Sequence, residues 1–350
     1  MNKPHIFNQY PQTTAPFMHL MFEQATELLP LKGLSIAHNV PLTQTTLLKI
    51  ACLQASGAEL TVTNPSFMQH DQTTLNWLEQ HSIPFKSINS IQGEFDFLLD
   101  CGAELDENCT ARKGIVELTR TGAIRYQQHS RNQVPIVSVD DSRLKCLETC
   151  LGTGEGVYRA ITELSQYALS QKNILIFGYG KVGVGIAYYF SKISSSVIIV
   201  EPCIKKHDII NERGFTAIDG AIRSQVEQAA LEADVIITAT GLKNIISDNY
   251  NHQCFSNAIL ANAGAEDEFG YAFEPNQVLA NKMPVNFSLV EPTLMAFLDP
   301  IFYAHNLACL DILQNSTHGF RPFNSQWDKD IVEQWARHHD WASSELDAIF

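Results

Sequence analysis

The sequence predicts an α/β protein of two domains, each built on a mostly parallel sheet. From residue 34 onward, short apolar segments alternate with segments of helical periodicity, a pattern typical of parallel sheets covered by helices. The second observation is a glycine-rich turn that directly follows the apolar run 174–177. The third is length, since 350 residues are enough for two domains that each bury their own core.

The elements expected in the first part of the chain are strands at 34–38, 59–64, 95–100 and 135–139, and helices at 42–54 and 75–81. The second part begins with a helix at 154–169. It continues with strands at 174–177, 197–200, 234–238 and 258–263, and with a helix near 221–232. Beyond these elements we expect one long helix over 290–313, interrupted at Pro300. The tail 315–350 holds Trp327, Trp335 and Trp341, and Ile331 shares a helix face with Trp335, so we expect a docked helix there.

The glycine-rich turn predicts a dinucleotide site. Gly178, Gly180 and Gly183 have the G-x-G-x-x-G spacing, in which the first glycine allows the tight turn and the second lets the backbone approach a diphosphate. The third permits close packing of helix on strand, and the diphosphate sits on the free N–H groups of the helix that begins there. Glu201 ends the next strand, where an acid accepts hydrogen bonds from the ribose hydroxyls and favours NAD over NADP. Lys205 and Lys206 weaken that preference slightly.

Composition excludes several classes of function. The formal net charge of −14 argues against a nucleic-acid or anionic-membrane partner, because both need a basic surface. No apolar run reaches the length of a membrane span, and the first residues lack the features of a signal peptide, so we expect a cytoplasmic protein. The eight cysteines are scattered and are most simply reduced thiols. Without Cys-x-x-Cys or His-x-x-His spacing, we expect no metal.

Several local motifs resemble S-adenosylhomocysteine hydrolase (adenosylhomocysteinase). They are 139–145 (Val-Asp-Asp-Ser-Arg-Leu-Lys), 152–156 (Gly-Thr-Gly-Glu-Gly) and 178–185, in the order and at the spacing of that family, and the resemblance covers about residues 28–313. It implies a tightly held NAD that oxidises the 3′-hydroxyl of a substrate ribose. A thiol is then eliminated, water is added and the ketone is reduced back.

The resemblance carries over part of the site. Lys145 matches the family lysine beside the nicotinamide, Thr43 and Thr119 match threonines of the substrate pocket, and Gln69 and Glu117 fall in aligned motifs. The cofactor residues that it implies are Gly178, Tyr179, Gly180, Lys181, Val182, Gly183, Glu201, Thr240 and Asn262.

The sequence departs from the family mainly in the substrate half. Pro41 replaces an active-site histidine, Cys101 a catalytic aspartate, Leu118 a glutamate and Ala265 a second histidine. Glu148 stands near the place of a further aspartate, one residue out of register. Each general acid–base step contributes about 10²–10⁴-fold, so these losses predict that the parent reaction is abolished.

The candidate catalytic residues are therefore Lys145 as base, with Glu148, Cys101 and His305, while Thr43, Asp100 and Thr119 position the substrate. Each of these residues also has a purely structural interpretation. Glu148 would be a surface residue, His305 a capped or surface histidine, and Cys101, Cys146 and Cys150 small buried hydrophobic residues.

We expect a substrate-like domain at 1–145, completed by 290–350, and a Rossmann-like NAD-binding domain at 146–289, in a formate/glycerate dehydrogenase-like arrangement around a cleft. The favoured function is NAD-dependent oxidation of a hydroxyl or amine carbon of a small polar or nucleoside-like substrate, either as a net dehydrogenase or with internally recycled NAD. The alternatives are an adenosylhomocysteinase with displaced catalytic groups and an NAD-binding pseudoenzyme that regulates a partner. The family and the tail also predict a homo-oligomer, a dimer or a tetramer.

Overall fold

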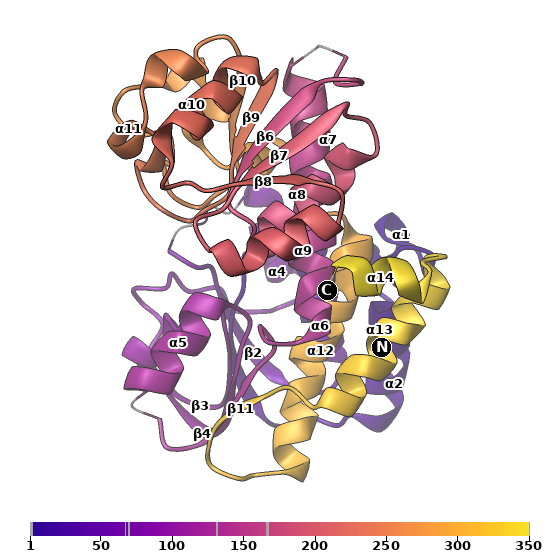
Figure 1. Cartoon of the computed structure of the whole chain (residues 1–350). Coiled ribbons are helices and arrows are strands. Elements are labelled where there is room, and N and C mark those ends of the chain that lie inside the picture. The colour runs from indigo at the N-terminus through magenta and orange to yellow at the C-terminus, as the bar shows by residue number, and fades with distance from the viewer. Residues whose placement is uncertain (1–2, 67, 69–70, 131, 166–167, 350) are drawn as a thin grey trace. The chain divides into compact units, whose positions relative to one another are not determined.

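The computed structural model describes residues 3–349 except 67, 69–70, 131 and 166–167, and Figure 1 shows the course of the chain. It divides into two compact units. The first comprises Met1–Lys145 and Met295–Ser343, and the second comprises Cys146–Leu294 and Ser344–Phe350. Each unit is an α/β body with one parallel sheet, so the predicted fold class is confirmed.

The sheet of the first unit has the strand order β11-β5-β4-β3-β1-β2. Its elements are α1 (Ile6–Gln9), α2 (Pro16–Leu28), β1 (Ser35–Asn39), α3 (Gln44–Ala55), β2 (Glu59–Thr63), α4 (Gln72–Gln80), β3 (Gly93–Asp100), β4 (Cys109–Glu117), α5 (Arg120–His129), β5 (Pro135–Ser138), α6 (Arg143–Cys146), α12 (Met295–Gln314), β11 (Gly319–Pro322) and α13 (Ser325–His338). The strands β4 and β11 were not predicted. The first half of β4 is polar and exposed around Arg112 and Lys113, so it lacks the apolar run of a buried strand.

The two faces of this sheet are covered by different helices. Ala37, Leu98, Ile115 and Ile136 come from four neighbouring strands and pack with Tyr126 of α5 in one core cluster. Because side chains alternate along a strand, the residue after each of the four points to the opposite face, which α12 covers. Polar side chains near the strand ends therefore belong to two separate environments.

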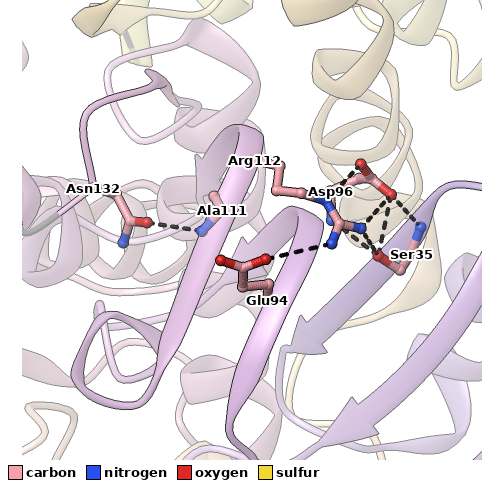
Figure 2. A network of polar contacts seen from close by, with 6 residues as sticks. All are labelled: Ser35, Glu94, Asp96, Ala111, Arg112 and Asn132. Carbon is pink, nitrogen blue, oxygen red and sulfur yellow. Dashed lines mark hydrogen bonds and ion pairs between the residues drawn. The ribbon is translucent and has the colours of Figure 1, made fainter.

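A polar network closes the amino end of this sheet (Figure 2). Asp96 of β3 accepts hydrogen bonds from the backbone N–H of Ser35 at 2.9 Å and from the Arg112 guanidinium at 3.1 and 3.2 Å. Arg112 also pairs with Glu94 at 3.8 Å. The hydrogen bond from Arg112 is the main cause that lowers the pKa of Asp96 to about 2. This network ties β1, β3 and β4 together, far from their carboxyl ends.

The long helix α12 corrects one prediction. It begins at Met295 and runs through Pro300 without a break, so the predicted interruption is wrong. Pro300 cannot donate a hydrogen bond to the carbonyl oxygen of Ala296, four residues earlier. The indole N–H of Trp335 in α13 donates to that oxygen at 2.7 Å instead. A tail residue thus satisfies the carbonyl group that the proline leaves open.

The second unit has the strand order β10-β9-β6-β7-β8, with β6 in the centre. A π-helical turn (Leu147–Gly152) leads into its other elements, which are α7 (Thr153–Ser165), β6 (Asn173–Phe177), α8 (Lys181–Ser191), β7 (Ser196–Val200), α9 (His207–Glu212), β8 (Thr216–Ile218), α10 (Arg223–Glu232), β9 (Val235–Thr238), α11 (Ile245–Asn249), β10 (Ile259–Asn262) and α14 (Ser343–Ile349). The chain leaves the central strand in both directions, so the sheet is doubly wound and Rossmann-like. The short strand β8 was not predicted.

The last helix, α14, is held against α8 by polar contacts. Glu345 accepts a hydrogen bond from the Tyr188 hydroxyl and pairs with Lys192 at 3.7 Å. Within the part of the chain that the structure describes, no helix has the length and apolar character needed to cross a bilayer.

Candidate functional site

The glycine-rich turn of the second unit joins β6 to α8 and leaves little room for side chains. Gly178 has a φ of +94°, and a Cβ there would lie 2.7 Å from the carbonyl oxygen of Ala239. A Cβ on Gly183 would lie 2.1 Å from the carbonyl oxygen of Gly178, so the helix packs directly on the turn. Gly180 differs, because nothing outside its own stretch of chain lies within 4 Å of its Cβ position. The turn is closed against the protein at two glycines and open at the third.

The start of α8 offers backbone donors at this opening. The helix begins at Lys181 after the N-cap Gly180, which has no side chain to cap it. The first N–H groups of a helix have no acceptor within it, and a phosphate group is a ligand that such groups bind. Val182 packs against the core of the unit and supports the turn. Tyr179 is buried, and its hydroxyl accepts a hydrogen bond from Arg213 at 3.3 Å.

Glu201 follows β7 and turns its carboxylate toward the glycine turn. Its Oε2 accepts a hydrogen bond from the backbone N–H of Tyr179 at 3.0 Å and lies 3.2 Å from the Lys206 amine. Its Oε1 accepts from the backbone N–H of Cys203 at 3.0 Å. The open Gly180, the uncapped helix start and this carboxylate together fit a dinucleotide with free ribose hydroxyls.

Thr240 and Asn262 lie beyond the end of β9 and at the end of β10, and both hold loops of the protein. The backbone N–H and the hydroxyl of Thr240 donate to the carboxylate of Glu268 at 2.9 and 2.7 Å, and the N–H of Gly241 donates to it at 2.6 Å. The amide of Asn262 donates to three carbonyl oxygens, among them that of Lys282 at 2.8 Å. Burial raises the pKa of Glu268. Sequence reasoning missed Glu268, because no signal distinguishes it from the two acids before it. A cofactor contact of Thr240 or Asn262 stays a prediction.

Lys145 and Cys101 come near each other toward the carboxyl end of the sheet in the first unit. Lys145 is 8 % exposed, and its backbone N–H donates to the Ser142 hydroxyl at 3.1 Å. Burial raises the pKa of the Cys101 thiol, and the carboxylates of Glu117 and Asp100 raise it further, whereas the charge of Lys145 lowers it. The net direction is upward, so a neutral thiol faces the lysine.

Asp100 holds the turn that carries Cys101. Its Oδ1 accepts hydrogen bonds from the Asn39 amide and the Cys101 N–H, both at 2.8 Å. Its Oδ2 accepts from the Leu105 N–H at 2.9 Å and from the Tyr126 hydroxyl at 2.6 Å. Burial raises the pKa of this fully buried carboxyl group. The contact of Asp100 with a substrate stays a prediction.

Glu117, the last residue of β4, is a second buried carboxyl group that binds the same turn. It accepts hydrogen bonds from the N–H groups of Gly102 and Ala103 at 3.0 and 3.1 Å. The N–H and the hydroxyl of Thr119 donate to it at 2.7 Å each. Burial, and then the neighbouring charge of Asp100, raise the pKa of Glu117 to about 7. Thr119 thus hydrogen-bonds a buried carboxyl group whose pKa is raised.

Thr43 lies just before α3 and is half-buried. Its hydroxyl oxygen is 2.9 Å from that of Thr45 and 3.1 Å from that of Thr46. Pro41 accepts a hydrogen bond from the Thr46 hydroxyl at 2.6 Å through its carbonyl oxygen. Gln69 lies outside the described residues.

His305 of α12 is fully buried on the sheet face that α12 covers. Its Nε2 donates to the carbonyl oxygen of Val116 at 3.0 Å, while its Nδ1 has no partner among the described residues. Burial, followed by the charges of Lys49 and Lys145, lowers its pKa well below the usual value. Lys49 of α3 is also fully buried, 3.1 Å from Nε2 of His38, and burial lowers its pKa to about 7. Sequence reasoning missed His38 and Lys49, although a lysine on the apolar helix 42–54 is a signal.

Glu148, Cys146 and Cys150 belong to the second unit. The Glu148 carboxylate accepts a weak hydrogen bond from the Thr149 hydroxyl at 3.4 Å. A hydrogen bond to Cys146, and then burial, raise the pKa of Cys150. Across the described ranges, no three His, Cys, Asp or Glu side chains are grouped to hold a metal ion. The roles expected for these residues stay predictions.

Comparison with known proteins supports NAD as the cofactor. Residues 149–275 match the family model for the NAD binding domain of S-adenosyl-L-homocysteine hydrolase. The adenosylhomocysteinase of Archaeoglobus fulgidus is 27% identical over 268 residues, covering 69% of this chain and 64% of the relative. The S-inosyl-L-homocysteine hydrolase of Methanopyrus kandleri is 28% identical over 282 residues, covering 72% and 64%. The chain therefore spans less than two thirds of the length of these relatives. The predicted resemblance is confirmed, and the match supports NAD as the cofactor.

Solved structures show the fold alone. A dipicolinate synthase chain from Bacillus halodurans is similar with a TM-score of 0.50 and 12% identity, covering 82% of this chain and 99% of that one. The corresponding dipicolinate synthase chain from Bacillus subtilis gives a TM-score of 0.51 at 13% identity, covering 81% and 98%.

Proposed function

We propose that this chain is an NAD-dependent enzyme that oxidises a hydroxyl or amine carbon of a small polar or nucleoside-like substrate. The observation that carries the proposal is the glycine turn, which is open at Gly180 and faces the carboxylate of Glu201. The family match over residues 149–275 supports the same cofactor. The lysine Lys145, retained from the family pattern, favours a reaction over binding alone.

In this proposal, residues of the second unit bind the cofactor and residues of the first unit act on the substrate. The N–H groups at the start of α8 hold the diphosphate, and Glu201 accepts from the ribose hydroxyls once it releases part of its present contacts. When bound, NAD supplies the acceptor for a hydride from the substrate carbon. In its neutral amine form, Lys145 accepts the proton of the substrate hydroxyl and becomes ammonium, and the hydroxyls of Thr43 and Thr119 orient the substrate. Cys101 is a poor replacement for the family aspartate as a base. Its pKa is raised, so the thiol stays protonated and cannot accept a proton.

Standard hydrolysis of adenosylhomocysteine is disfavoured by the side chains at the family positions. Pro41 and Ala265 cannot transfer a proton, and Leu118 has no carboxyl group. Each such group contributes roughly 10²–10⁴-fold to a reaction that needs it. The relatives named adenosylhomocysteinase and S-inosyl-L-homocysteine hydrolase nevertheless make such hydrolysis the second candidate, which the retained Lys145, Thr43 and Thr119 favour.

One experiment separates these candidates. The full chain, loaded with NAD, is incubated with adenosine, inosine and a set of small polar alcohols, and NADH formation is followed by absorbance. We expect NADH with at least one substrate and a loss of roughly 10²-fold or more in Lys145→Met. Lys113→Met, at an exposed lysine of the same unit, is the control and keeps full activity.

The other outcomes identify the alternatives. Formation of a thioether from adenosine or inosine plus homocysteine, without accumulation of NADH, supports the hydrolase. Bound NAD without any chemistry, together with a cellular function that Lys145→Ala leaves intact, supports the regulatory pseudoenzyme.

We also propose that the chain forms a homo-oligomer, a dimer or a tetramer, in the cytoplasm, with no nucleic-acid or membrane partner. Light scattering on the purified protein tests the assembly. A monomer at every concentration would contradict it.

A further inference from the structure

The loop after β7 brings an amine to the acid of the cofactor site. Lys206 Nζ lies 3.2 Å from Oε2 of Glu201 and donates a hydrogen bond to the carbonyl oxygen of Tyr179, also at 3.2 Å. It therefore bridges the carboxylate and the backbone of the glycine turn. Oε2 is also the oxygen that accepts from the Tyr179 N–H, so the amine stands where Glu201 meets the turn.

The amine of Lys206 alters how strongly Glu201 excludes NADP from the site. A carboxylate at this position repels the additional phosphate of NADP, because two negative groups would meet at one ribose. An ammonium group at hydrogen-bond distance offsets the charge of Glu201 and offers a donor to a phosphate. Glu201 is nearly buried, with a side chain 7% exposed, whereas that of Lys206 is 41% exposed. The lysine is therefore the partner with room to turn toward a ligand.

The other basic side chains that the structure describes near Glu201 do not contact its carboxylate. His207 hydrogen-bonds the carbonyl oxygen of Glu201 at 2.7 Å, and Arg213 donates to the Tyr179 hydroxyl at 3.3 Å, so both hold protein groups. Lys205 is exposed and has no hydrogen bond or ion pair among the described residues. Among these groups, Lys206 alone combines an amine, partial exposure and contact with the carboxylate.

Resting on the proposed function, we propose that Lys206 determines cofactor specificity by admitting a 2′-phosphate beside Glu201, so that the site binds NADP as well as NAD. In the NAD complex, Glu201 takes the ribose hydroxyls and Lys206 moves aside or stays on the backbone of Tyr179. In the NADP complex, the amine pairs with the 2′-phosphate and keeps it apart from the carboxylate. Because the second complex depends on an added ion pair, its affinity falls more steeply with salt than that of the first.

The test measures the dissociation constants of NAD and NADP by calorimetry on the full chain, at low and high salt. We expect the unmodified protein to bind the two cofactors within about tenfold of each other, a difference of roughly 1.4 kcal/mol. Lys206→Met should weaken NADP at least tenfold and leave NAD unchanged or tighter. Glu201→Gln should weaken NAD and improve the ratio in favour of NADP, because the repelling charge is removed.

Lys205→Met is the matched control. It removes the same charge from the adjacent residue, which makes no contact with Glu201, and we expect less than a twofold change for either cofactor. Equal effects of Lys205→Met and Lys206→Met would overturn the inference, and so would a protein that binds NAD but not NADP. A protein that binds neither cofactor contradicts the proposed function itself. Thermal melting of each variant confirms that it is folded.

Discussion

The glycine turn of the second unit and the polar side chains of the first unit are built in different ways. In the turn, the positive φ of Gly178 and the carbonyl oxygen of Gly178 beside Gly183 are features of one short segment of backbone. In the first unit, Glu117 accepts hydrogen bonds from a turn 14 and 15 residues away, and Lys49 meets His38 across 11 residues. Sites made by local backbone are readable in a sequence, whereas networks of buried side chains depend on which elements pack together.

The largest effect is expected from a pair of glycine substitutions that separates packing from binding. Gly183→Ala places a methyl group 2.1 Å from a carbonyl oxygen, so it should cost about 1–3 kcal/mol of stability and abolish NAD binding. Gly180→Ala meets no protein atom, so its melting temperature should not change, while NAD binding weakens about tenfold because the methyl group stands where the diphosphate approaches. Calorimetry and thermal melting measure both. Equal destabilisation by the two variants would show that the turn is not open at Gly180.

The next largest effect tests the buried amine of the first unit. Burial lowers the pKa of Lys49 from 10.5 to about 7, so the unfolded chain binds more protons between these values and stability rises with pH through this window. Lys49→Met should remove that slope and the cost of burying the amine. Because it also leaves Nε2 of the buried His38 without this partner, the net stabilisation at pH 7 should be on the order of 1–3 kcal/mol. Denaturant unfolding between pH 6 and 10 measures it. If the variant and the parent show the same pH slope, the amine is not buried as described.

The sequence was sufficient for the fold class, for the strand–turn–helix around the glycines and for the place of Glu201 after a strand, because each depends on local periodicity or on glycine spacing. It was insufficient for β4, since an exposed start around Arg112 and Lys113 hides the apolar second half of the strand. It also missed Glu268, whose partners at residues 240–241 lie 27 and 28 positions away.

The full burial of His305 could not be predicted from the sequence either. Helical periodicity placed the residue on a long helix but could not say which face of that helix meets the sheet. The missing N–H of proline predicted a break at Pro300. The sequence could not show that the Trp335 indole, 39 positions beyond Ala296, donates to the carbonyl oxygen that the proline leaves without a partner. Contacts between residues far apart in the sequence are the common reason for the failures at Glu268, His305 and Pro300.

A smaller effect is expected where Trp335 completes α12. Trp335→Phe removes the donor to the partly buried Ala296 carbonyl group and should cost about 1 kcal/mol, because that group loses its hydrogen bond. In a Pro300→Ala background, the restored N–H can donate to that carbonyl oxygen, so the same substitution should cost less. A double-mutant cycle from denaturant unfolding gives the difference. Additive costs would show that the indole does not replace the missing hydrogen bond.

The smallest effect is expected at the amino end of the same sheet, where the Arg112 side chain is half-exposed (Figure 2). Arg112→Met should raise the pKa of Asp96 from about 2 toward its usual value. The lowered pKa contributes stability above the unfolded pKa that is lost as the pH falls toward 2, and at neutral pH the substitution should cost little because solvent screens the exposed Arg112 side chain. NMR titration of the Asp96 carboxyl group tests the shift. An unchanged pKa would mean that Ser35 rather than Arg112 holds the carboxylate.

The central claim is that the second unit is a working NAD site, and the most direct measurement is the nucleotide content and NAD affinity of the purified full chain. Mass spectrometry of the protein-bound nucleotide, followed by calorimetric titration of the stripped protein, should show one NAD per chain, lost in Gly183→Ala. Protein that arrives without nucleotide and shows no heat of binding with NAD would contradict the account.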